Sequence, residues 1–208
     1  MVISKVAADL WCFDRAAAEE RYGHISDWDV SSVTNMSELF RGRSGYFEPV
    51  DDSYRGNDLF NDDISGWDVS NVTNMNDMFG GAHSFNQPVG DWDVSKVTNM
   101  NDMFGGAESF NQPVGDWDVS KVTDMNHMFA GAQSFNQPVG DWNVSKVTDM
   151  NGTFHFAVEF NQPVGKWDVS SVTDMSGMFC KANAFNQSVG DWDVSKVTNM
   201  YIMFAHAG

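Results

Sequence analysis

Apolar and polar residues follow one another in the same order through most of this chain, with a period of 25 residues. One full repeat, from residue 92 to residue 116, reads WDVSKVTNMNDMFGGAESFNQPVGD. A recurrence of this length is typical of solenoids and other stacked arrays. Each repeat is called a coil here and is named by its tryptophan, as in coil 92. The tryptophans at this spacing are Trp67, Trp92, Trp117, Trp142, Trp167 and Trp192.

Two periodicities alternate within each coil. Residues 91–95 alternate between polar and apolar, which predicts a short strand with Trp92 and Val94 on its buried face. Residues 100–110 carry apolar side chains at helical spacing, which predicts one or two helical turns. One coil cannot bury its own tryptophan and phenylalanines, but stacked coils form a continuous core. The pattern therefore predicts an α/β solenoid of about seven coils, each with one short strand and one short helical turn.

The repeat also divides the chain. Residues 28–208 form the predicted array, and residues 1–27 form a predicted helical cap. The face of the cap that covers the first coil is expected to include Val6, Leu10, Trp11 and Phe13. Coil 28 is longer than the others, so we place an insertion at residues 41–59. The last coil stops before its Phe-Asn-Gln segment and is incomplete.

Composition excludes several functions. The formal net charge is -17, with 29 acidic and 12 basic side chains, which disfavours nucleic acid and anionic membranes as partners. No apolar run is long enough to insert into a bilayer, and the first residues lack the unbroken apolar stretch of a signal peptide. Cys12 and Cys180 are expected to be reduced, buried thiols. We expect no cofactor, with calcium as the single exception discussed below.

The segment V-T-x-M-x-x-M-F-x-x-A-x-x-F-N-Q, as in residues 97–112, resembles the repeat of BspA-like leucine-rich-repeat surface proteins. The resemblance covers residues 28–204. It implies a right-handed leucine-rich-repeat-like solenoid that serves adhesion or protein recognition at a cell surface. The segment before the array is similar to the helical cap of some family members.

Two sets of polar residues have structural and functional interpretations. The asparagine of each Phe-Asn pair is interpreted as a ladder that hydrogen-bonds the turns, rather than as a ligand site. The aspartates beside the tryptophans face outward, and they either cap turns or hold a hard cation such as Ca²⁺. The candidate metal residues are Asp91, Asp93, Asp116, Asp118, Asp191 and Asp193. A column of threonines, which includes Thr98 and Thr123, leaves ice binding as a weaker alternative.

Function is expected where the repeat is broken. The insertion contributes Tyr46, Phe47, Tyr54 and Arg55, which are residue types common at protein interfaces, although the segment could equally be a variable spacer.

Coil 142 is the second break, and it contributes Thr153, His155, Phe156 and Val158. Phe156 either adds apolar surface or turns inward to fill the volume that Thr153 leaves. The sequence has no common catalytic motif, and its histidines are spread over different coils, so we expect no enzyme activity.

The last coil is the third break, because its apolar side has no following coil to cover it. We therefore expect either that another chain stacks end to end on this coil or that the natural protein continues past residue 208. The sequence as a whole predicts a non-enzymatic scaffold that binds a protein or a cationic ligand, with a cation-binding structural element as the competing interpretation.

Overall fold

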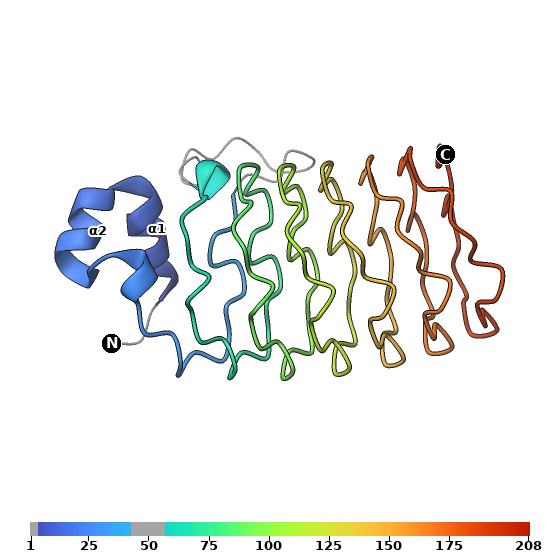
Figure 1. Cartoon of the computed structure of the whole chain (residues 1–208), viewed down its shortest axis with the longest axis horizontal. Coiled ribbons are helices and arrows are strands. Elements are labelled where there is room, and N and C mark those ends of the chain that lie inside the picture. The colour runs from blue at the N-terminus through green and yellow to red at the C-terminus, as the bar shows by residue number, and fades with distance from the viewer. Residues whose placement is uncertain (1–3, 43–56) are drawn as a thin grey trace.

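The computed structural model describes residues 4–42 and 57–208, and it shows a row of coils with two helices at one end (Figure 1). The helices are α1 (Lys5–Phe13) and α2 (Arg15–Tyr22). Two short 3-10 helices follow, η1 (Ile25–Asp27) before coil 28 and η3 (Asn57–Leu59) before coil 67.

Adjacent coils pair through parallel backbone bridges at one position per coil, seven residues after the tryptophan. The bridges run from Asn35 to Asn74 and then, every 25 residues, on to Asn199. Neighbouring backbone groups extend each bridge, since the Met100 N–H donates to the Asp124 carbonyl at 3.1 Å. Residues one repeat apart therefore lie side by side in the stack (Figure 1).

The strand predicted over residues 91–95 is wrong, because turns lie at Asp91 and Ser95 and the residues between them pair with no neighbouring strand. The Ser95 N–H donates to Asp93 Oδ1 at 3.0 Å, and the Val97 N–H donates to the Val94 carbonyl at 2.8 Å. These local bonds use backbone groups that a strand would offer to its neighbour. The predicted facing of the side chains is nevertheless correct, since Trp92 and Val94 are buried and Asp93 is exposed.

The helical turn predicted over residues 100–110 is also wrong. Over residues 67–208 the structure has turns in place of helices. Asp102 and Gly106 have left-handed φ angles of 50° and 71°, which interrupt any helix. The N–H groups alternate in direction, because that of Met103 bonds within the coil and that of Phe104 bonds to the next coil. The apolar side chains at helical spacing are buried all the same.

Stacked aromatic rings fill the core. The ring centroid of Phe104 lies 3.9 Å from that of Phe110 in its own coil and 5.6 Å from that of Phe129 in the next coil. Trp117 packs on the same ring, and its indole N–H donates to the Val89 carbonyl at 3.1 Å. The tryptophans therefore belong to the core and not to a ligand-stacking surface.

The asparagine ladder is confirmed. Asn111 Oδ1 accepts hydrogen bonds from the Asn136 N–H and from Gln137 Nε2 of the next coil, both at 3.0 Å. The same arrangement joins Asn61 to Asn86 at the other end of the ladder. These amides satisfy turn backbone groups, so they serve the scaffold.

The cap buries a narrower face than the sequence predicted. Trp11 is buried and its ring meets Trp28 edge-on at 5.7 Å, but Val6 and Phe13 are exposed. Phe13 is the last residue of α1, and the chain turns away at Asp14, whose carboxylate accepts the Ala17 N–H and begins α2. Among the described residues, no helix has the length and apolar content to span a bilayer.

Candidate functional site

The aspartates beside the tryptophans act in turns. Asp118 Oδ1 accepts the Ser120 N–H at 3.0 Å, and hydrogen bonds from Ser120 hold the pKa of this carboxyl below its usual range. Asp93 and Asp193 make the same bonds with the same effect on their pKa values.

Asn143 shows that this role does not need a charge. It occupies the equivalent position in coil 142, and its Oδ1 accepts the Ser145 N–H at 3.2 Å. The other three candidates, Asp91, Asp116 and Asp191, are exposed. Within residues 4–42 and 57–208, no three His, Cys, Asp or Glu side chains are grouped so that they could hold a metal ion. The geometry of these columns therefore indicates turn formation.

The threonine column is likewise tied to the backbone. Thr98 Oγ1 donates to the Thr73 carbonyl at 3.2 Å, and Thr123 Oγ1 donates to the Thr98 carbonyl at the same distance. Each hydroxyl thus supports the ladder between coils.

The residues predicted to bind a partner differ in where the structure places them. Tyr46, Phe47, Tyr54 and Arg55 lie outside the described residues. Thr153 is buried, and its hydroxyl is bonded to the carbonyls of Met125 and Met150 at 3.1 and 2.9 Å. It therefore cannot contact a partner and serves the core instead.

The remaining three residues of coil 142 reach the surface. His155, Phe156 and Val158 are each partly exposed. Phe156 does not turn inward, because the Phe154 ring occupies the core and stacks 5.7 Å from Phe129. The repeat break thus changes the surface as well as the core.

Phe156 belongs to a face built from three columns of residues, at 10, 13 and 14 positions after each tryptophan. We call it the variable face. Position 10 carries Glu38, Asp77, Asp102, His127, Gly152, Gly177 and Ile202. Position 13 carries Arg41, Gly80, Gly105, Ala130, His155, Cys180 and Ala205. Position 14 carries Gly42, Gly81, Gly106, Gly131, Phe156, Lys181 and His206.

Large side chains change columns along this face. In coils 67 and 92 the carboxylate at position 10 folds over the glycine at position 13, and a Cβ on Gly80 would overlap Asp77 Oδ1. In coils 142 and 167 the large side chains stand at positions 13 and 14, and position 10 is glycine. His127 lies at the junction, because a Cβ on Gly152 would come within 2.5 Å of its ring. In coils 67 and 92 the carboxylate at position 10 thus occupies the space that a side chain at position 13 would need.

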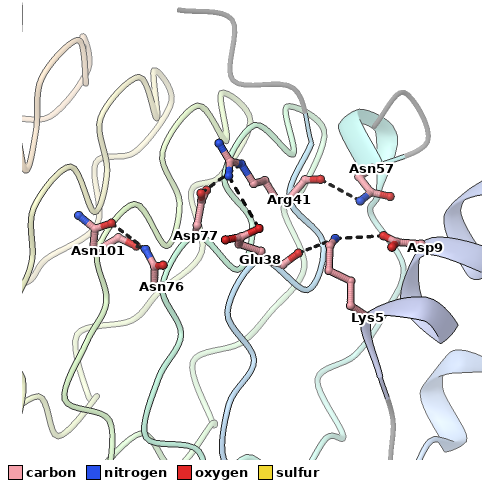
Figure 2. Close-up of polar contacts among 8 residues, drawn as sticks. All are labelled: Lys5, Asp9, Glu38, Arg41, Asn57, Asn76, Asp77 and Asn101. Atoms are coloured by element: carbon pink, nitrogen blue, oxygen red, sulfur yellow. Dashed lines mark hydrogen bonds and ion pairs between the residues drawn. The ribbon is translucent and has the colours of Figure 1, made fainter. Parts of the chain in front are cut away.

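The half of the variable face next to the cap is acidic. Figure 2 shows Arg41 between Glu38 and Asp77, with Arg41 Nε 3.1 Å from Asp77 Oδ2. Lys5 of α1 donates to the Glu38 carbonyl at 2.9 Å and pairs with Asp9 (Figure 2). These contacts join the cap to the first coils. Charged groups in this half are therefore engaged with one another.

Burial raises the pKa of Asp77 to about 7, and the nearby Arg41 guanidinium opposes this increase only in part. Burial also raises the pKa of Asp102, against the influence of His127. A carboxyl whose pKa is higher in the folded state stabilises the fold below its unfolded pKa and loses that contribution as the pH rises through the folded value. The contribution of Asp77 to stability therefore falls as the pH rises from about 4 to about 7, and it stays lost at higher pH.

Asp77→Asn is expected to have the same free energy of unfolding as the wild type at pH 4. At pH 8 its free energy of unfolding should be higher by on the order of 2 kcal/mol. The asparagine cannot ionise, so the cost of burying the charge disappears. Urea unfolding at both pH values measures the difference. Glu108→Gln, which removes an exposed carboxyl, is the matched control. An equal effect of the two variants would contradict the assignment.

The other half of the variable face is basic and aromatic. Lys181 Nζ lies 4.1 Å from the centroid of the Phe156 ring, and the His155 ring lies 4.6 Å from the same ring. Burial lowers the pKa of His155, and His127 and Lys181 lower it further. The group combines an aromatic ring, an imidazole and an ammonium group on one surface.

The last three coils have non-glycine residues with left-handed backbone at position 14, whereas in the earlier coils the non-glycine residues with this conformation are at position 10. Phe156, Lys181 and His206 have left-handed φ angles of 56°, 61° and 59°, at a position that is glycine in coils 28 to 117. Such a conformation costs a residue with a Cβ about 1–2 kcal/mol. Strained residues of this kind concentrate at functional sites. The broken repeat of coil 142 marks Phe156 but not Lys181, which lies in the next coil.

Two other features are less suited to recognition. A cavity beside α1 is lined by Trp11, Cys12 and Asp62, but Trp11 Nε1 already donates to the Asp62 carboxylate at 2.9 Å. Burial, followed by the negative charges of Asp9 and Asp62, raises the pKa of Cys12 to about 12, which removes thiolate reactivity.

The last coil exposes apolar side chains, including Tyr201 and Phe204. Its predicted self-association stays a prediction.

These features define a repeat protein in which conserved spacing builds the frame and altered positions shape one face. The chain belongs to the family described as "Mycoplasma protein of unknown function, DUF285", whose model matches residues 10–52, 46–137 and 112–208. No curated protein and no solved structure matches this chain.

Proposed function

We propose that this chain is a non-enzymatic binding scaffold of the leucine-rich-repeat-like solenoid class, and that it recognises a protein partner through the basic half of the variable face. The finer resemblance to BspA-like surface proteins agrees with a role in adhesion. The coils supply a rigid frame, and His155, Phe156 and Lys181 supply the contacts.

The observation that carries this proposal is the Phe156 backbone. Earlier coils have glycine at its position, and the chain here tolerates a left-handed phenylalanine beside a lysine. A core role does not explain the substitution, because the ring is partly exposed. Aromatic side chains held beside basic groups are common where proteins bind one another.

The surroundings support binding rather than catalysis. The carboxyl of Asp77, whose pKa is strongly raised, is paired with Arg41 and lies in the acidic half of the variable face. An active site needs an asymmetric pocket with a nucleophile or an acid and base beside a substrate. The polar ladders of the coils instead bond to the backbone.

Phe156→Gly tests the proposal, because it restores the residue found at this position in coils 28 to 117. We expect the free energy of unfolding to change by less than about 1 kcal/mol, since relief of strain offsets lost packing. Binding should fall at least roughly tenfold, as for the loss of an interface aromatic. Immobilised protein, incubated with an extract of cell-surface proteins, gives the retained partners by quantitative mass spectrometry.

Tyr201→Ala is the matched control, because Tyr201 is an exposed aromatic residue outside the variable face. Partners should be retained by this variant and lost by Phe156→Gly. The reverse result would move the binding surface to the last coil. A large loss of stability in Phe156→Gly would show that the ring supports the fold instead.

A further inference from the structure

The basic half of the variable face reverses the sign of charge that dominates the molecule. The chain has a formal net charge of -17, yet the ionisable groups at positions 13 and 14 in coils 142, 167 and 192 include His155, Lys181 and His206 and no carboxylate. Resting on the proposed function, we propose that His155, Phe156 and Lys181 form a site for a carboxylate side chain on an acidic segment of the partner.

Lys181 is held in place for such a contact. Its backbone N–H donates to the Ala205 carbonyl at 2.8 Å, and its ammonium group lies over the Phe156 ring. Across the described part of the chain, no carboxylate lies within ion-pair distance of Lys181, whereas Lys5, Arg15 and Arg41 each pair with at least one. Contact with an aromatic ring does not use all three N–H donors of the Lys181 ammonium group, so it can still donate to an added carboxylate oxygen.

His155 supplies a second donor. Among the residues that the structure describes, the charged groups that influence it are His127 and Lys181, which are both basic. A neutral imidazole can donate one N–H to a carboxylate oxygen. Two donors beside an aromatic ring suit the planar carboxylate and the aliphatic stem of a glutamate.

The large negative charge of the chain does not prevent this contact. Salt screens exposed charges that lie more than about 8–10 Å apart, so the local basic group dominates at physiological ionic strength. An acidic residue opposite Lys181 would also lie away from Glu38 and Asp77, which occupy the coils near the cap. The partner segment is therefore expected to place its acidic end over coils 142 to 192.

A fluorescent peptide of alternating Glu and Ser tests the proposal by anisotropy and by amide NMR of the full chain. We expect shifts at residues 155, 156 and 181. Lys181→Glu should weaken binding roughly five- to tenfold, while Lys196→Glu, which makes the same charge change in the column of Lys96 and Lys121, leaves it unchanged. A matching peptide of Lys and Ser should bind Lys181→Glu more tightly than the wild type. Thermal unfolding confirms that both variants fold.

Equal weakening by the two variants would overturn the proposal, as would the absence of shifts at these residues. A phosphoserine peptide forms a further arm, and binding more than tenfold tighter than the glutamate peptide would replace the carboxylate by a phosphate group. If the wild type retains partner proteins that Phe156→Gly loses, while the glutamate peptide fails to bind, the proposed function stands and the carboxylate inference is wrong.

Discussion

Trp117→Ala is expected to lower the free energy of unfolding by about 3–5 kcal/mol, the usual cost of removing a large buried ring. Trp117 is 4% exposed and packs on Phe104 with ring centroids 6.2 Å apart. Its loss would also leave the Val89 carbonyl without the indole N–H. Urea unfolding followed by circular dichroism measures the effect.

A matched pair of milder variants separates packing from hydrogen bonding. The indole N–H of Trp92 is buried without a hydrogen-bond partner within the described structure, whereas that of Trp117 is bonded. Trp117→Phe should therefore cost about 1–3 kcal/mol more than Trp92→Phe. Equal costs would show that the indole bond contributes nothing to stability.

Asn111→Ala is expected to cost about 1–3 kcal/mol, because it removes the acceptor for two donors of the next coil. The Asn136 N–H and Gln137 Nε2 both donate to Asn111 Oδ1 at 3.0 Å. Asn111→Asp keeps an oxygen at this position and should recover most of the stability. The same unfolding measurement compares the three proteins.

Gln133→Ala provides the reference for a polar change on the surface, since Gln133 is exposed. It should alter the free energy of unfolding by no more than about 0.5 kcal/mol. If Asn111→Ala behaves like Gln133→Ala, the ladder has no part in holding the coils together.

The sequence predicted which side chains are buried but not the backbone that buries them. Trp92, Val94 and Phe104 all lie in the core, as their spacing indicated. The strand and helical turn were wrong because local bonds decide the backbone. Asp93 captures the Ser95 N–H, and left-handed residues such as Asp102 break the helical path. Side-chain periodicity reports the direction a residue faces and does not report these bonds.

The candidate site was predictable in part for a similar reason. The broken repeat marked His155 and Phe156 but also Thr153, whose hydroxyl bonds to buried carbonyls. Lys181 joins the site only because residues one repeat apart become neighbours, which brings its ammonium group over Phe156. The exchange of large side chains between positions 10 and 13 could have been read from the aligned coils. Its physical cause could not, because the sequence does not show that in coils 67 and 92 the side chain at position 10 fills the space beside position 13.

The account depends on the pairing of residues 25 positions apart. The most direct measurement is the NMR scalar coupling across a hydrogen bond between coils, from the Thr123 N–H to the Thr98 carbonyl, which the structure places 2.9 Å apart. A detectable coupling here and at Thr148 to Thr123 is the predicted result. Couplings from these N–H groups to carbonyls at another sequence spacing would contradict the stacked arrangement and the variable face that it creates.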